Sequence, residues 1–203
     1  MAAQLARILK MASLLALALP AACGSSDSSQ VNVVAIGQAG DPFADGAQRS
    51  LAGQLVRSSV AEGLVALDDQ GRVIPALADR WIVTDDGKSY IFRLRDGTWR
   101  NGSEITARSA TLALRNARRA LRGTALALDL GGIEEVREMA GRVVEIRLTH
   151  PMPHFLQLLA QPELGLTRSG EGAGPMRLTR EGNVAVLTPI APDDLGLPAV
   201  EKW

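Results

Sequence analysis

The stretch from Leu77 to Ala107, LADRWIVTDDGKSYIFRLRDGTWRNGSEITA, contains the densest structural signals of this sequence. An Asp86-Gly87 pair stands between two runs of β-prone residues, and glycine supplies the positive φ that a tight hairpin turn needs. The run after the turn alternates between two faces, with Tyr90, Phe92 and Leu94 on one and Ile91, Arg93 and Arg95 on the other. We therefore expect a β-hairpin here.

A helix is expected directly after this hairpin. Two short turns, Asp96-Gly97 and Asn101-Gly102, enclose Trp99, and Thr106 stands where a helix N-cap would stand. The residues from Ala107 to Arg122 place their apolar side chains on one stripe, formed by Ala107, Ala110, Leu114, Ala117 and Leu121. Gly123 is expected to end the helix.

The same predicted helix contains five arginines and no acidic residue, namely Arg108, Arg115, Arg118, Arg119 and Arg122. Such a run fits either an anionic partner or a solvated helix face. We favour the solvated face, because arginine is also a good helix former.

Other elements follow from apolar runs and turn residues. We expect a buried strand over Val31–Ile36 and an amphipathic helix over Ala44–Val60, with Leu51 and Leu55 packing on the first sheet. A hairpin turn is expected at Asp69–Arg72. Further strands are expected over Val143–Leu148 and Asn183–Leu187.

Three motifs of the chain resemble the bacterial extracellular solute-binding proteins of family 5, the peptide- and nickel-binding receptors of ABC importers. The first is the order Pro75, Leu77, Ala78, Trp81, Asp86, Gly87, Tyr90, Phe92, Leu94, Arg95, Gly97, Gly102, Thr106 and Ala107. The family usually continues with an acidic pair, where this chain has Arg108-Ser109. The second is the order Leu148, Pro151, Pro153, Phe155, Leu156, Leu159 and Ala160. The third is Gly172–Met176, which is similar to the family's G-T-G-P-Y loop with Ala173 and Met176 in place of threonine and tyrosine.

The resemblance implies a mixed α/β (α+β) fold, the two-lobed periplasmic-binding-protein fold of type II with an extra small domain. It implies the first part of lobe I over 31–66, a small domain over 67–165 and a return to lobe I over 166–203. Members of the family are more than twice as long as these 203 residues. The chain is therefore a fragment, the product of a truncated gene or an unusual short form, and we favour a fragment from which the second ligand lobe is absent.

The N-terminal residues indicate a secretory signal over 1–22, with Arg7 and Lys10 before an apolar run. Cys23, the only cysteine, follows at once, and LPAAC resembles a lipobox whose cysteine is lipidated. The alternative is ordinary signal cleavage with an incidental cysteine. Residues 23–30 contain four serines and one glycine and are expected to form a flexible tether.

Composition and motifs exclude several functions. The 22 basic and 22 acidic residues leave no excess positive charge for nucleic-acid binding. No Gly-x-Ser-x-Gly elbow or phosphate-binding glycine loop is present, so neither an enzyme nor a cofactor is expected. His150 and His154 lie among prolines that prevent a helix, so we interpret them as surface residues and expect no metal site.

The resemblance implies the substrate-binding component of an ABC importer, a monomer in the periplasm that delivers an oligopeptide or similar solute to membrane permease subunits. Cys23 would attach the lipid that anchors it to a membrane. The positions of the loops in the family place Gln38, Ala39, Asp41 and Met176 at the ligand cleft; for Asp41, a plain Asp-Pro turn is the alternative. The alternative function is an envelope lipoprotein that uses the scaffold as a sensor or interaction module.

Overall fold

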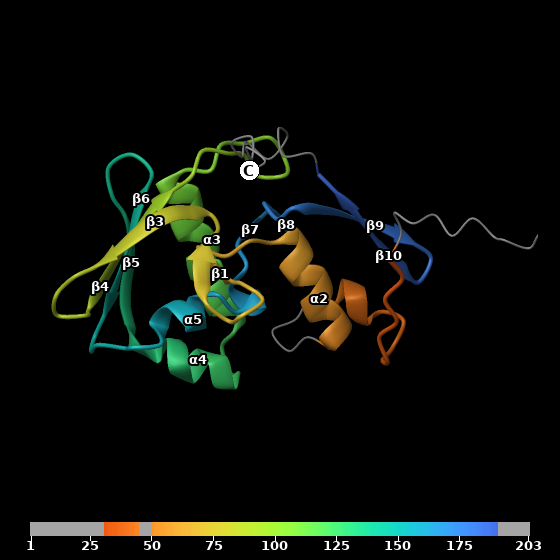
Figure 1. The fold of residues 1–203 in the computed structure, drawn as a ribbon, viewed down its shortest axis with the longest axis horizontal. Helices are drawn as coiled ribbons and strands as arrows, with labels where there is room; N and C mark the ends of the chain where they lie inside the picture. The colour runs from red at the N-terminus through yellow and green to blue at the C-terminus, as the bar shows by residue number, and fades with distance from the viewer. Residues whose placement is uncertain (1–30, 45–49, 191–203) are drawn as a thin grey trace, which may run out of the picture. The chain divides into compact units, whose positions relative to one another are not determined.

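The computed structural model describes residues 31–44 and 50–190, and its contacts divide the chain into two compact units, 1–34 and 35–203. The predicted signal segment, Cys23 and the tether lie outside the described residues. In chain order the elements (Figure 1) are η2 (Asp41–Phe43), α2 (Leu51–Val60), β1 (Val65–Leu67), β2 (Val73–Pro75), β3 (Ala78–Val83), β4 (Ser89–Leu94), α3 (Ala107–Ala120), α4 (Ala125–Asp129), η3 (Leu130–Gly132), β5 (Ile133–Glu138), β6 (Val143–Leu148), α5 (Phe155–Leu159), η4 (Pro162–Leu164), β7 (Thr167–Arg168), β8 (Glu171–Gly172), β9 (Met176–Glu181) and β10 (Val184–Pro189). The predicted mixture of helices and strands is confirmed.

A four-stranded antiparallel sheet in the order β3-β4-β6-β5 lies within residues 67–165, the range predicted for the small domain. The predicted hairpin is β3–β4, with Trp81 opposite Phe92. Its turn is closed by a bond from Thr84 N to Ser89 O at 3.0 Å, and Gly87 has φ +67°. The predicted strand over Val143–Leu148 is confirmed as β6. β5 was not predicted.

Three smaller antiparallel hairpins complete the sheet structure, β1–β2, β7–β8 and β9–β10. The first turns at Asp69–Arg72 as predicted, with Gly71 at φ +76°. The third contains the predicted strand after Asn183, which forms as β10, and its partner β9 was not predicted. Within the part of the chain described here, helices are too short or too polar for a membrane span.

α3 packs against β5 and β6, and in Figure 1 it lies along the sheet. It begins as predicted after Thr106, whose side chain accepts a bond from Ser109 N at 3.1 Å, while Ser109 Oγ accepts one from Thr106 N at 2.9 Å. This capping box satisfies two backbone donors that would otherwise lack partners. Gly123, with φ +85°, follows the helix end.

The core between α3 and the sheet is built around a few large side chains. Phe92, Trp99 and Phe155 are all 1% exposed or less. The Trp99 indole donates to Ser109 Oγ at 3.0 Å, so its buried polar atom is satisfied. Most of the remaining buried side chains are alanine, leucine and valine, as the low aromatic content implies. The aromatic residues are few, but they fill the centre.

The predicted solvated face of α3 is only partly correct. Arg108, Arg115, Arg119 and Arg122 are exposed and Arg118 is half-buried, but Arg118 donates to Ile133 O at 3.1 Å and Arg115 donates to Val136 O. Both acceptors belong to β5, an edge strand with unpaired carbonyls. These two arginines therefore cover a sheet edge.

One prediction near the N-terminus is wrong, and a second is only partly correct. Residues 31–36 form no strand and are mostly exposed, because none of the described strands pairs with them to supply hydrogen bonds. α2 begins at Leu51 with Ser50 as its N-cap; of the predicted earlier turns, 45–49 lie outside the described residues and Ala44 is extended. Leu51 and Leu55, expected in the core, are 67% and 44% exposed, since α2 packs instead through Gly53 and Val56.

Candidate functional site

The segment from Gly172 to Met176, called the strap below, crosses the C-terminal end of α2 at backbone contact distance. Gly174 N donates to Val60 O at 3.0 Å. A Cβ added at Gly172 would lie 2.2 Å from Val60 O, and one added at Gly174 would lie 2.5 Å from Val60 C. Only glycine permits this approach, which explains the two glycines of the predicted loop in terms of packing.

Arg100 fastens the strap to the loop that follows β4. Its Nη2 donates to Gly174 O and to Met176 O, both at 2.9 Å. Burial lowers the pKa of this guanidinium, and the charge of Arg177 adds to that effect. An arginine remains protonated all the same, so the strap is held by charge-assisted bonds.

A second crossing, between Glu62 and Leu166, runs beside the strap. Leu166 N donates to Glu62 O at 2.9 Å, and Arg57 donates to Gly165 O at 2.7 Å. The Glu62 carboxylate accepts from Arg95 Nη2 at 2.7 Å. Burial raises the pKa of Glu62, and the attraction of Arg95 opposes that rise. The α2 region, meaning residues 50–63, is thus joined by backbone and ionic contacts to the sheet domain, meaning the four-stranded sheet and its neighbouring elements over residues 64–166.

The loop Gly37–Gly40 before η2 is stabilised by its own aspartate. Gln38 N donates to Asp41 Oδ2 at 3.0 Å, and Asp41 N donates to Gln38 O, also at 3.0 Å. A Cβ at Gly37 would lie 2.4 Å from that same carboxylate oxygen. The Asp41 carboxylate therefore holds the loop shape, and Gln38 and Ala39 are left exposed to solvent.

The structure connects this loop with β9. The guanidinium of Arg180 lies 4.4 Å from the centre of the Phe43 ring, a cation–π contact. Met176 is half-buried at the start of β9, four residues before Arg180, which is about 13 Å along a strand. The loop and Met176 therefore lie towards opposite ends of β9, and Cys23 lies outside the described residues.

The helix α2 has an apolar surface exposed to solvent. Leu51 and Leu55 are exposed on α2, which contacts η2, β9 and β10. Sequence reasoning placed both leucines in the core, because a helical stripe does not say which face the chain covers. The exposed stripe is a feature of the site that was missed.

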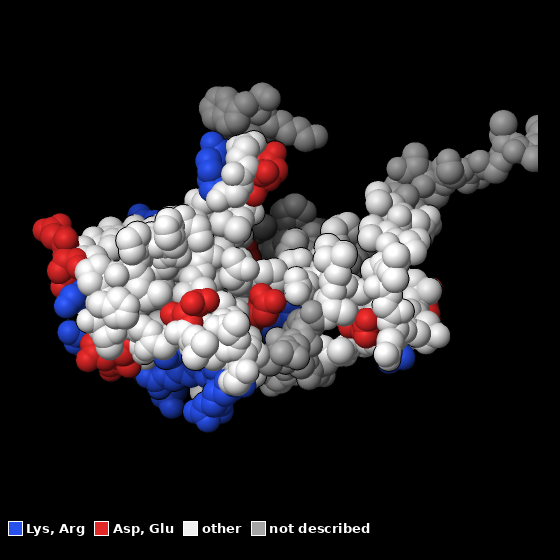
Figure 2. All heavy atoms as spheres, turned by 90° about the horizontal axis from the view of Figure 1, so that it is seen from below, with Lys and Arg blue, Asp and Glu red and all other residues white. Residues whose placement is uncertain are grey.

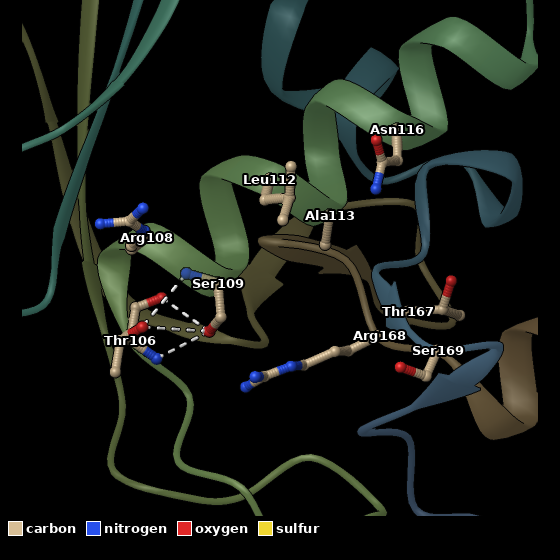
Figure 3. Close-up of a pocket in the computed structure, with 9 residues that line it drawn as sticks. All are labelled: Thr106, Arg108, Ser109, Leu112, Ala113, Asn116, Thr167, Arg168 and Ser169. Carbon is tan, nitrogen blue, oxygen red and sulfur yellow. Dashed lines mark hydrogen bonds between the residues drawn. The ribbon is translucent and has the colours of Figure 1, made fainter.

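A separate hollow of about 400 Å³ lies between the first half of α3 and the β7–β8 turn (Figure 3). The Arg168 side chain extends across it and donates to Ser103 Oγ at 2.9 Å, whereas Thr106 and Ser109 are engaged in the helix cap. The described residues that line it carry no carboxylate, thiol or imidazole, and they offer hydrogen-bond donors for binding.

The two histidines give no metal site in the geometry described. Both are exposed, His154 directly before the short helix α5, and His150 Nδ1 shares a hydrogen bond with Thr149 Oγ1 at 2.9 Å. Residues 31–44 and 50–190 contain no group of three histidine, cysteine or acidic side chains placed to hold a metal ion.

Comparison with known proteins places this arrangement in a family. Residues 72–177, just over half of the chain, match the family described as "Bacterial extracellular solute-binding proteins, family 5 Middle". The chain belongs to this family. The resemblance drawn from the three motifs is therefore confirmed, and the matched segment runs from the β1–β2 turn through the strap.

Individual family 5 relatives match over part of their length. The probable deoxycholate-binding periplasmic protein YgiS of Escherichia coli is 34% identical over 125 residues, which are 51% of this chain and 23% of that protein. The oligopeptide-binding protein OppA of Bacillus subtilis is 26% identical over 156 residues, 68% of this chain and 28% of that protein. The chain thus spans about a quarter of the length of these relatives.

A solved structure supports the fold. A periplasmic oligopeptide-binding protein of Borrelia burgdorferi superposes with a TM-score of 0.61 at 22% identity, covering 72% of this chain and 37% of that one. Part of the binding-protein fold is therefore present in this family 5 chain. The relatives named here are solute-binding proteins.

Proposed function

We propose that this family 5 chain forms part of the substrate-binding component of an ABC importer, which captures a peptide-like solute outside the cytoplasm and delivers it to membrane permease subunits. The observation that carries the proposal is the family match over residues 72–177. The names of several relatives support peptides as the solute class, among them the oligopeptide-binding protein OppA and the dipeptide-binding protein DppE of Bacillus subtilis.

The α2 region supplies the ligand-facing wall in this proposal. Gln38 and Ala39 are exposed at the loop before η2, and Leu51 and Leu55 add an apolar surface on α2. Ligand pockets combine such apolar surface with a few polar groups that fix orientation. In this proposal Asp41 keeps the loop in shape, and Met176 contributes to the wall from the start of β9, next to the strap. Closure of a second wall over this surface would shift an open–closed equilibrium towards the form that docks on the permease.

The location follows from the family and the N-terminal residues. Relatives of this chain are periplasmic proteins, as the names of YgiS of Escherichia coli and OppA of Haemophilus influenzae state. In this proposal the signal segment exports the chain, Cys23 receives the lipid that anchors it, and the receptor acts as a monomer. Cys23→Ser would then release the protein from the membrane fraction and abolish labelling by a fatty-acid analogue.

The proposal is tested on the product of the native gene, isolated from the cell envelope. Native mass spectrometry would identify any copurified solute, and calorimetry would measure binding of di- to pentapeptide mixtures, with deoxycholate as a separate arm. Saturable peptide binding that weakens in Gln38→Ala supports the proposal. Deoxycholate binding without peptide binding would replace the solute class. Binding of neither would favour the sensor or interaction module.

A further inference from the structure

Four arginines surround one hollow at the C-terminal half of α3. The hollow measures about 340 Å³ and lies between α3, α4 and η3. Arg115, Arg118, Arg119 and Arg122 line it, and Ala127, Leu130 and Gly131 complete its walls. Among the residues that the structure describes, no acidic side chain lines this hollow. Figure 2 shows basic side chains gathered in one patch at the lower edge of the view.

Two of these guanidinium groups are fixed by the fold. Arg118 Nη2 donates to Ile133 O at 3.1 Å and to Leu130 O at 3.4 Å, and Arg115 Nη2 donates to Val136 O. A guanidinium has five N–H donors, so most donors of both groups remain for a ligand. Burial lowers the pKa of Arg118, but an arginine stays charged in a protein. Two of the four positive groups at this hollow are therefore held in place by backbone carbonyl acceptors.

The other two arginines are exposed and adjustable. Arg119 Nη1 donates to Asn116 Oδ1 at 3.1 Å within the same helix. Arg122 has no side-chain hydrogen bond or ion pair in the part of the chain described by the structure. Neither supports the β5 edge as Arg115 and Arg118 do. Edge protection therefore explains only half of the cluster.

The clustering has an electrostatic cost that a ligand would relieve. The C-terminal end of a helix offers about half a negative charge, which offsets only part of four positive charges. Like charges within one hollow repel each other, and arginine does not neutralise by losing a proton. A cavity of this volume lies at the lower end of the range for small-molecule sites. A compact polyanion would satisfy both the charge and the free donors.

We propose that this hollow binds a phosphate-bearing anion, either a free phosphate compound or the phosphate of a lipid headgroup. The planar fork of arginine matches phosphate oxygens in pairs, which makes arginine the preferred residue for this group. The site is separate from the predicted solute cleft at Gln38 and the strap. Its test is therefore independent of the importer proposal.

The probes are pyrophosphate in solution and vesicles of phosphatidylcholine with or without phosphatidic acid, added to the whole chain. The variant is Arg119→Gln/Arg122→Gln, which removes two charges and leaves the bonds to β5 in place. The matched control is Arg93→Gln/Arg147→Gln, two exposed arginines on the opposite sheet face. Circular dichroism would check that all three proteins share one fold.

We expect saturable pyrophosphate binding, or binding to vesicles only when phosphatidic acid is present, that weakens by about tenfold or more in the α3 variant. The control should change affinity by less than about twofold, since its charges are remote and screened. Pyrophosphate binding assigns the site to soluble phosphates, and vesicle binding alone assigns it to lipid headgroups. Equal losses in variant and control, or no saturable binding to either probe, would overturn the proposal.

Discussion

Replacing Gly174 by alanine tests the strap geometry most directly. The new Cβ would lie 2.5 Å from Val60 C, 2.7 Å from Ser59 O and 2.8 Å from Ala61 N. All three are backbone atoms, so no flexible side chain can move aside. The strap must lift away from α2, and the bond from Gly174 N to Val60 O at 3.0 Å must lengthen.

The expected loss has two parts. Forcing a methyl group into a packed contact costs about 1–3 kcal/mol. Losing one backbone hydrogen bond costs about 0.5–1.5 kcal/mol more. We therefore expect Gly174→Ala to lower the free energy of unfolding by about 2–4 kcal/mol, with the lower value if the strap detaches locally and keeps its bonds to Arg100.

Urea unfolding followed by circular dichroism would measure this loss. Gly131→Ala is the matched control, because a Cβ there meets nothing within 4 Å. We expect the control to remain within about 0.5 kcal/mol of the parent chain. If Gly174→Ala were as stable as Gly131→Ala, the close approach of strap and helix would be refuted.

Three other predictions concern the core, the helix cap and pH. Phe92→Ala should lower the free energy of unfolding in urea by about 3–5 kcal/mol, because Phe92 is fully buried. Ile82→Ala, at a 65% exposed site on β3, should lower it by under about 1 kcal/mol. Similar losses would contradict the assigned core. Thr106→Ala should cost about 1 kcal/mol through the lost α3 cap, unlike Thr179→Ala on exposed β9, and equal costs would argue against the capping box. Burial raises the pKa of Glu62 in the folded chain. Between the ordinary and the raised pKa, the folded chain therefore binds more protons than the unfolded chain. The free energy of unfolding should fall as pH rises through that window. Unfolding measured from pH 4 to pH 7 should show that component missing in Glu62→Gln; an identical pH profile would contradict it.

The elements that sequence predicted correctly have local signals. Asp86-Gly87 marks the β3–β4 turn, β6 alternates strictly, and Thr106 caps α3. Each signal depends on a few neighbouring residues, so tertiary contacts need not be known. The same reasoning placed the β1–β2 turn at Asp69–Arg72.

The strands that were missed lack the expected period. β5 has its buried residues Ile133 and Val136 three positions apart, because the register shifts between Ile133 and Glu135. A bulge of this kind breaks the alternation that identifies a strand. β9 is mostly exposed, so its sequence carries little apolar alternation. Neither strand could be recognised from period alone.

The contacts around the candidate site could not be predicted from the sequence for a related reason. The glycines of the strap are visible in the sequence, but the backbone of Val60 that requires them is more than a hundred residues away. Arg100 gave no signal either, since an arginine in a loop is ordinary. Leu51 and Leu55 were misassigned because periodicity finds an apolar face without saying what covers it.

The contacts around the strap indicate which parts of this family 5 chain move together. The chain passes between the α2 region and the sheet domain at Gly63–Leu64 and again at Leu166–Gly174. Backbone hydrogen bonds hold both passages. They run from Leu77 N to Gly63 O, from Leu166 N to Glu62 O and from Gly174 N to Val60 O. Arg57, Arg95 and Arg100 add bonds to Gly165 O, Glu62 and Gly174 O across the same junction. A hinge needs a junction whose backbone is free to rotate, but at this junction hydrogen bonds hold both passages of the chain. The α2 region and the sheet domain should therefore act as one rigid body, so that any closure around a solute moves a second wall against both together.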